Sequence, residues 1–288
     1  MPTSTANVAE WIEQLPEPDR PGQASTFTGP PPEEAARLCE RVVAAGPAGV
    51  NALIGLIREP GEPEFKSYKA AYLLHGVAIH VGAPGKEAQR EMFATSLAAH
   101  LGSSTLSKPV QRLLIRELQV AGSREAVAAL GKVLLDEALG PDAAMALAAI
   151  GGEEAAAQLG RSLPKATGAI RLAIAQQLGV LRHIGSVRAL QGMLRDADAE
   201  ARLVAAWALA RIGDPRSVDA LLGEADAAAG WQRIKATQAC LLLAETLLAA
   251  GKRTPARVLY THLRDSHTDP SESHVREAAA KALSGLGG

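Results

Sequence analysis

The sequence predicts an all-α fold: an α-solenoid in which antiparallel helical hairpins stack into a right-handed superhelix. A hairpin pattern in residues 196–225 and its recurrence along the chain are the first two observations. The third is composition, since the 288 residues are 47% hydrophobic but only 3% aromatic. Ala and Leu packed between closely spaced helices account for so few large rings, whereas one globular core of this size would carry more.

The first helix of the hairpin runs from Asp198 to Ile212. Its apolar residues fall at offsets 0, 3, 4, 7, 8 and 11, the spacing of one helical face: Ala201, Val204, Ala205, Ala208, Leu209 and Ile212. Asp198 and Glu200 stand at its start, where exposed amides and the helix dipole favour negative charge. Gly213 after the last turn predicts a left-handed C-terminal cap.

The second helix begins directly afterwards. Asp214 is expected to cap it, and Pro215 fits its first turn, where no N–H is needed. Val218, Leu221, Leu222 and Ala225 then repeat the offsets 0, 3, 4 and 7. Neither helix can bury its apolar stripe alone, but stacked copies can, which is the physical basis of a solenoid.

Two leucine series show that the hairpin is repeated. The first has intervals of 29, 31 and 31 residues: Leu118, Leu147, Leu178 and Leu209. The second follows 12 residues later at every step: Leu130, Leu159, Leu190 and Leu221. Two series in one phase over four units indicate a structural repeat.

The repeat extends in both directions with distortions. Upstream we expect one hairpin at about 33–58 and a longer one at about 63–82 and 86–102. Downstream, an insertion of 12 residues lengthens the helix from about Trp231 to Ala250. These segments make about seven hairpins.

The predicted organisation has two parts. Residues 1–32 form a short amphipathic helix followed by a Pro-rich linker, and residues 33–288 form the solenoid, with a capping helix at 273–286. The N-terminal helix is expected to cap the first hairpin, and the alternative is a tethered peptide that docks on a partner.

Two segments carry a resemblance to a known family. Ala201-Arg202…Ala205-Ala206…Ala208-Leu209…Ile212-Gly213-Asp214 and Val275-Arg276…Ala278-Ala279…Ala282-Leu283…Leu286-Gly287 resemble HEAT repeats, most closely the short bacterial type first associated with phycobilisome lyases. The resemblance implies an α-solenoid with an inner and an outer helical layer. It also implies that the Val-Arg-x-x-Ala-Ala helix lines the concave, ligand-facing side.

If those helices face a groove, the side chains off the buried stripe form its surface. These positions differ from repeat to repeat while the buried ones recur, which is the pattern expected of a surface that recognises one irregular partner. An exposed Trp near Arg is also typical of interface hot spots; the alternative is that Trp207 packs over an adjacent repeat. The predicted partner-binding residues are Trp207, Arg211, Leu203, Arg112, Arg116, Gln176, Gln238 and Lys281.

A second candidate is a basic-aromatic patch in the first long hairpin, formed by Lys66, Lys69, Tyr72 and His75. With Arg112 and Arg116 it would suit an acidic peptide or a phosphate-bearing ligand. The alternative is that the lysines lie along apolar surface and that the histidine is a hydrogen-bonded core residue.

The sequence lacks the motifs of several functional classes. None of the seven histidines is followed by Glu, so the His-Glu pairs of HEAT-like di-iron hydroxylases are absent from the sequence, and there is no Gly-rich phosphate loop, Cys-x-x-Cys or Gly-x-Ser-x-Gly. A net charge of -1 argues against nucleic acid and anionic membranes as partners. We expect no metal site and no cofactor.

The sequence therefore predicts a non-catalytic scaffold that binds a protein or peptide on the concave face of a monomeric solenoid. The N-terminus has no secretory signal and no stretch is apolar enough to span a membrane, so we expect a cytoplasmic protein. The alternative function, implied by the resemblance alone, is a bilin lyase-like or other prosthetic-group-handling enzyme or chaperone.

Overall fold

The fold is helical throughout the residues that the computed structural model describes, which are 5–17, 29–57 and 67–286. Helices alternate with short turns, and no strand occurs in these ranges. The predicted all-α solenoid is thereby confirmed. Contacts divide the chain into two compact units, Met1–Ile150 and Gly151–Gly288. The predicted boundary after residue 32 stays a prediction.

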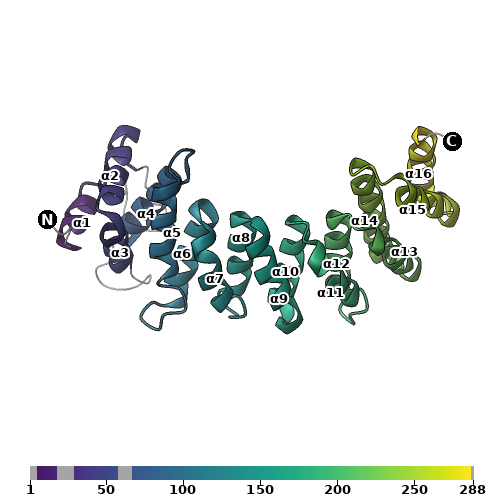
Figure 1. Ribbon diagram of the computed structural model, residues 1–288, viewed down its shortest axis with the longest axis horizontal. Helices are drawn as coiled ribbons and strands as arrows, with labels where there is room; N and C mark the ends of the chain where they lie inside the picture. The colour runs from purple at the N-terminus through teal and green to yellow at the C-terminus, as the bar shows by residue number, and fades with distance from the viewer. Residues whose placement is uncertain (1–4, 18–28, 58–66, 287–288) are drawn as a thin grey trace. The chain divides into compact units, whose positions relative to one another are not determined.

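The first unit contains eight α-helices among its described residues. They are α1 (Thr5–Glu13), α2 (Pro32–Ala44), α3 (Gly46–Leu56), α4 (Ser67–Gly82), α5 (Glu87–Ala98), α6 (Lys108–Ala121), α7 (Val127–Val133) and α8 (Gly140–Ile150). Helices α2, α4, α6 and α8 pack one against the next in one layer, and α3 and α5 pack together behind them (Figure 1). Helix α1 lies on α3 and α4 and buries Val8 and Ile12, as expected of a cap on the first hairpin.

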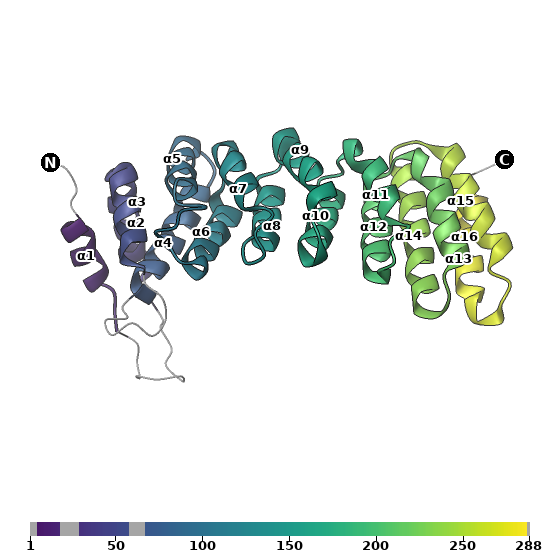
Figure 2. The same ribbon diagram turned by 90° about the horizontal axis from the view of Figure 1, so that it is seen from below.

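The second unit also contains eight α-helices in its described part. They are α9 (Gly152–Ser162), α10 (Gly168–Val180), α11 (Val187–Met193), α12 (Ala199–Ile212), α13 (Val218–Ala227), α14 (Gly230–Ala249), α15 (Arg253–Ser266) and α16 (Ser273–Gly285). Helices α10, α12 and α14 form one continuous layer. On the other side α11 packs against α12, and α13 and α15 pack against α14 (Figure 2). The last helix, α16, packs against α15.

The turn between α12 and α13 has the predicted chemistry. The Asp198 carboxylate accepts a hydrogen bond from the Glu200 amide at 3.0 Å, which caps α12. Gly213 ends the helix with φ 71°, and Asp214 accepts from the Arg216 amide at 2.8 Å. These contacts satisfy backbone groups that have no partner within a helix.

The turn after α10 departs from this pattern. Arg182 lies 31 residues before Gly213, at the equivalent position, and has φ 52°. It is the one residue other than glycine with positive φ in the described ranges. A side chain in the left-handed region is disfavoured by contact of its Cβ with the backbone, so this turn is less stable than its glycine counterpart.

Close helix packing in the second unit depends on Gly179 in α10. A Cβ atom there would lie 2.7 Å from the Ala208 Cα and 2.9 Å from the Trp207 ring of α12. Both distances are shorter than side chains tolerate. The absence of a side chain therefore sets how closely α10 and α12 approach.

Polar groups are also part of the buried interior. His267 is fully buried at the end of α15, where its ring nitrogens lie 3.1 Å from the Thr237 and Ser266 hydroxyls. Burial lowers the pKa of this imidazole below its ordinary 6.5. The thiols of Cys39 and Cys240 are buried and free, and burial raises their pKa to about 11 and about 12.

We predict that Gly179→Ala destabilises the protein by about 1–3 kcal/mol, because the added methyl group must displace the α12 backbone. The matched control is Gly223→Ala in α13, where an added Cβ meets nothing within 4 Å. That substitution should stabilise by about 0.5–1 kcal/mol through helix propensity. Urea unfolding measures both, and equal effects of the two substitutions would contradict this account of the α10–α12 contact.

We predict that stability falls as the pH is lowered through 6.5, the ordinary imidazole pKa. The folded protein binds a proton at His267 more weakly than the unfolded chain does, so the stability from neutral His267 is full above that pH and is lost below it. His267→Gln should flatten the slope of unfolding free energy against pH between about 7 and 5. Because the pKa of His80 is lowered as well, the slope should shrink without vanishing; an unchanged slope would contradict the assignment.

Candidate functional site

The layer formed by α10, α12 and α14 contains a groove with a volume of 580 Å³. Because these helices run side by side in register, each contributes side chains from the face turned away from α11 and α13. We call this surface the α12 groove. Its lining residues are Gln176, Glu200, Leu203, Val204, Trp207, Trp231, Lys235, Gln238, Ala239 and Leu242.

Two tryptophans dominate the groove, and each carries a cation over its ring. The Arg211 guanidinium lies 5.8 Å from the centre of the Trp207 ring, and the Lys235 ammonium lies 5.5 Å from that of Trp231. Both pairs are four residues apart on one helix, so the side chains meet along a single turn. A cation over an indole face is attracted by the ring quadrupole.

The two indoles differ in burial. Trp231, near the start of α14, is 63% exposed. Trp207 is half-buried, because one edge of its ring lies over Gly179 of α10. Trp207 therefore packs on the adjacent repeat, as the alternative prediction held, and also lines the groove.

The groove surface follows the sequence repeat of 31 residues. One row across α10, α12 and α14 is apolar: Leu172, Leu203 and Ile234. The next places an indole between two carboxamides: Gln176, Trp207 and Gln238. Ile234 is 54% exposed, which is high for a large aliphatic side chain.

Several polar groups here lack partners among the described residues. The carboxamides of Gln176 and Gln238 are solvent-facing and form no hydrogen bond with them. The Nε of Arg211 is shut off from solvent and has no hydrogen-bond acceptor. A buried donor without an acceptor is unfavourable by about 1–3 kcal/mol, and Gln89, Ser107 and Ser217 also have a buried polar atom without a partner among the described residues.

Four of the eight predicted partner-binding residues line the groove, namely Gln176, Leu203, Trp207 and Gln238. Arg211 lies beside it over the Trp207 ring. Lys281 is exposed on α16 and is not among the lining residues.

The remaining two predicted residues, Arg112 and Arg116, belong to α6 of the first unit and are engaged there. Both pair with Asp142 of α8, with N–O distances of 3.3 and 3.4 Å. Arg112 also donates to the Ala138 carbonyl at 2.6 Å. They link neighbouring helices and have less freedom to bind a ligand than the sequence suggests.

The predicted basic-aromatic patch is corrected at one position. Lys69 is only 1% exposed, and its ammonium donates to the Glu17 carboxylate at 2.7 Å. The Tyr68 hydroxyl donates to the same carboxylate at 2.8 Å. The segment after α1 therefore covers the face on which the patch was expected, while Lys66 lies outside the described residues.

The other patch members lie on α4. Tyr72 is half-buried, and its ring lies beside Gly29. His75 donates to the carboxylate of Glu117 on α6 at 2.9 Å. Burial raises the pKa of Glu117, and the hydrogen bond from His75 opposes that rise. His75 thus stabilises a buried acid between α4 and α6.

Six residues that line the groove were not among the predicted partner-binding residues: Glu200, Val204, Trp231, Lys235, Ala239 and Leu242. A signal for two of them was present. Trp231 and Lys235 repeat the four-residue spacing of Trp207 and Arg211. Searching for that spacing would have found the second indole.

Other kinds of site have little support in the described ranges. No group of three or more His, Cys, Asp or Glu side chains there could hold a metal ion. No helix in the same ranges is both long and apolar enough to cross a membrane. A hollow of 690 Å³ on α15 is lined by one helix only, and one of 620 Å³ in the first unit lies between α2, α4 and α5.

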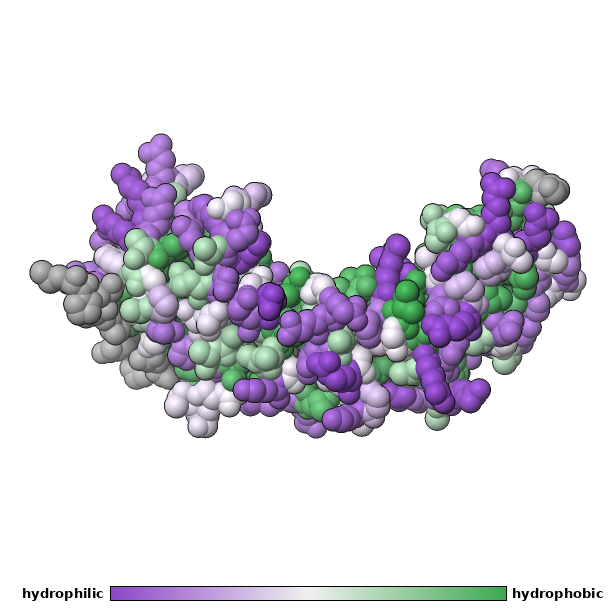
Figure 3. Space-filling view, in the orientation of Figure 1, coloured by the Kyte–Doolittle hydropathy of each residue, from purple (hydrophilic) through white to green (hydrophobic). Residues whose placement is uncertain are grey.

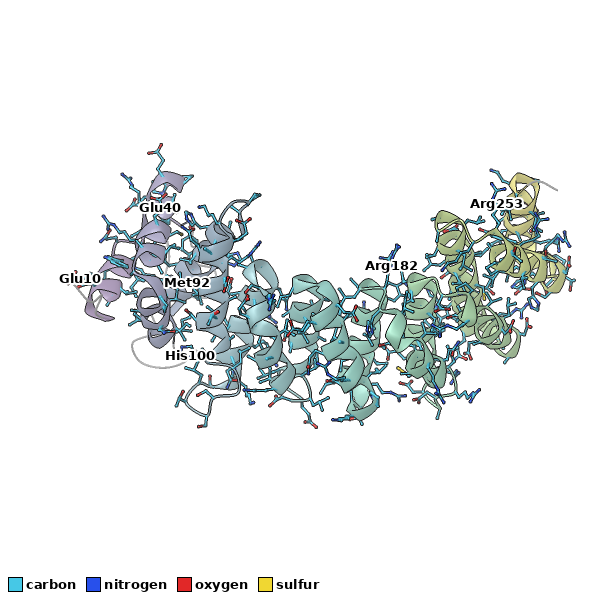
Figure 4. All side chains as sticks on the ribbon, in the orientation of Figure 1. Glu10, Glu40, Met92, His100, Arg182 and Arg253 are labelled. Atoms are coloured by element: carbon cyan, nitrogen blue, oxygen red, sulfur yellow. The ribbon has the colours of Figure 1, made fainter. Side chains whose placement is uncertain are left out.

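We predict that His75→Ala destabilises the first unit by about 1–3 kcal/mol, because it leaves the Glu117 carboxylate buried without a donor. The control is His100→Ala, which removes a hydrogen bond to Asn51 at the surface (Figure 4). That change should stay within about 0.5 kcal/mol. Urea unfolding with equal losses for the two variants would show that the buried pair has no special role.

Comparison with known proteins gives a family for part of the chain. Residues 162–241 match the family model described as HEAT repeats. No curated protein sequence matches the chain. The match includes α10 and α12 and ends within α14.

Similar solved structures are distant. Human deoxyhypusine hydroxylase in complex with glycerol is 19% identical, with 84% of this chain and 97% of that one covered and a TM-score of 0.38. A designed armadillo repeat protein is 20% identical, with coverage of 66% and 99% and a TM-score of 0.41. The CpcE–CpcF complex of phycocyanin lyase from Nostoc sp. PCC7120 is 18% identical, with coverage of 84% and 96% and a TM-score of 0.37.

Likenesses this distant carry no information on activity. The family match does bear on the resemblance, because it spans the hairpin from which the repeat was recognised. The resemblance to HEAT repeats is thereby confirmed, and the chain is a protein that contains HEAT repeats, at residues 162–241.

Proposed function

We propose that the chain is a non-catalytic binding scaffold that holds a partner protein on the α12 groove. The observation that carries this proposal is the pair of indoles, Trp207 and Trp231, in one groove with polar groups that lack partners. Trp and Arg are enriched among residues that dominate binding energy at protein interfaces. An indole as exposed as Trp231 is unusual on a surface that stays in water.

The chemistry of the groove suits a peptide surface. The apolar row of Leu172, Leu203 and Ile234 offers area to bury. Gln176 and Gln238 on either side of Trp207 offer both donors and acceptors, which main-chain amides of a partner require. Apolar area surrounded by solvent-exposed polar groups is the composition of a protein–protein interface.

The proposal is tested with Trp231→Ala combined with Gln238→Ala. Both side chains are exposed, so the fold should be kept. The control is Val258→Ala, which removes an apolar side chain that is 47% exposed on α15 and does not line the groove. Circular dichroism and the melting temperature confirm folding of each variant.

The readout is cross-linking in the native cell followed by mass spectrometry. We expect the same partner proteins to be cross-linked to the unmodified chain and to the Val258 variant. With the double variant, the cross-linked yield of these partners should fall at least tenfold, since a hot-spot residue contributes about 2 kcal/mol or more to binding. A partner set that is the same for all three proteins would refute the groove as the binding site.

One alternative keeps a specific observation in its favour. Two indoles across a groove would also stack on a planar pigment, as a bilin lyase-like or other prosthetic-group-handling protein requires. In that case protein purified from its native cell would absorb visible light, and Trp231→Ala would remove the colour. Colourless protein with a cross-linked partner favours the scaffold.

A further inference from the structure

We infer that the α12 groove takes an acidic peptide segment of a partner protein, whose carboxylates bind Arg182, Arg211 and Lys235. The inference rests on the proposed function and adds the chemistry of the partner. It follows from three cations that form no ion pair with a described residue. Arg211 and Lys235 each lie over an indole of the groove, and Arg182 lies in the turn that ends the neighbouring helix α10.

Arg211 is the first of these cations. It stands in the last turn of α12, where the helix dipole favours positive charge. A free surface arginine would satisfy that preference with all its N–H groups in water. Instead the guanidinium lies over Trp207, and its Nε is buried without an acceptor. The ring thus fixes the plane of the guanidinium, and a carboxylate is the acceptor that fits its two terminal amino groups best.

Arg182 is the second and gives an independent observation. Its place in the repeat is a left-handed turn, which Gly213 fills at the end of α12 with φ 71°. Arg182 adopts φ 52° at the end of α10 although an arginine there is strained. A glycine would be less strained there, so backbone preference does not explain an arginine at this position.

The surroundings of Arg182 suit the binding of a peptide segment. Its side chain projects away from the ribbon at the end of α10 (Figure 4). On the face seen in Figure 3, hydrophobic residues lie among hydrophilic ones. Val180 and Ile184, which flank it in the sequence, are 44% and 60% exposed. A cation between exposed aliphatic side chains suits a segment that has both acidic and apolar residues.

Lys235 is the third cation and lies over Trp231. None of the three forms an ion pair with a described residue, although paired arginines are common in this unit. The paired examples are Arg171–Asp196, Arg202–Glu224, Arg216–Asp214, Arg233–Glu272 and Arg264–Asp265. The unit therefore has carboxylates in number, and among the described residues none of them forms an ion pair with these three cations, although Glu200 lines the same groove.

The position of Glu200 in the groove indicates the orientation in which an acidic peptide would bind. Glu200 is in the first turn of α12, and Arg211 is in the last. The acidic residues that bind Arg182 and Arg211 are therefore expected over the C-terminal ends of α10 and α12, away from Glu200. Lys235 lies in the second turn of α14 and would bind a separate acidic residue of the same segment. A basic segment would meet the opposite pattern and would bring like charges together at Arg211.

A selection from a random peptide library identifies the preferred chemistry without assuming a sequence. The library is displayed on phage and selected on the full chain, with the Trp231→Ala, Gln238→Ala variant as counter-selection. We expect the enriched peptides to be rich in Asp and Glu, and their binding to weaken as salt is raised. Neutral or basic peptides that still need Trp231 would overturn the acidic partner and leave the proposed function standing.

Variants at Arg182 separate its charge from its strain. Arg182→Gly should raise the melting temperature by about 2–4 °C, as the strain is released, and should weaken the selected peptide about 2- to 5-fold, as expected for one exposed ion pair. Arg182→Lys should retain binding. Arg211→Gln should weaken binding about 10- to 100-fold, because a hydrogen-bonded charge is lost.

Two further outcomes would contradict the inference. If Arg182→Gly stabilises the chain and binds the peptide as well as before, Arg182 is not a binding residue and the inference fails at that point. If the library yields no peptide that distinguishes the chain from the counter-selection variant, the acidic partner is refuted together with the groove.

Discussion

The structure depends on one constraint, which is that no hairpin of the chain can bury its apolar stripe without a neighbour. Stacking meets this constraint only if the helices approach closely, and close approach requires small residues at the contact. Gly179 against Ala208 is the clearest case, with a backbone separation that a single methyl group would violate. Because the apolar stripes are buried in stacking, the opposite face of each helix contributes less to stability, and its side chains can differ more from repeat to repeat. The irregular surface of the α12 groove is a consequence of the regular interior behind it.

Much of the fold could be predicted because the signals that specify it are local. Gly213, Asp214 and Pro215 end one helix and start the next through contacts within a few residues, and the leucine spacing fixes the repeat length. Lys69 shows the limit of prediction from local signals. Its partner Glu17 is 52 residues away, so helical spacing alone could not reveal that Lys69 is buried. The division of the chain after Ile150 depends in the same way on contacts between helices.

The groove was predicted in part, and the reason lies in its residues. Trp207 was identified because it interrupts a repeat whose phase was known. Trp231 lies one turn before the compared positions, and its counterpart in the repeat of 31 residues is Glu200, so no aromatic residue at that position drew attention to it. Arg182 looks like any exposed arginine in sequence, and only its backbone angle shows that it occupies a glycine position. The buried Arg211 Nε and the strained turn at Arg182 both lower the stability of the folded chain. They are tolerated because the stacked helices on either side compensate for that loss.

The buried thiols have a practical consequence. The chain has two cysteines, and burial keeps both protonated near neutral pH, so neither presents the thiolate that reacts with electrophiles. A cysteine introduced at an exposed position such as Gln238 would therefore be the reactive thiol of the protein. A maleimide dye or spin label can then be attached beside the groove while the native cysteines remain, and the distance or polarity that it reports would follow occupancy of the groove directly.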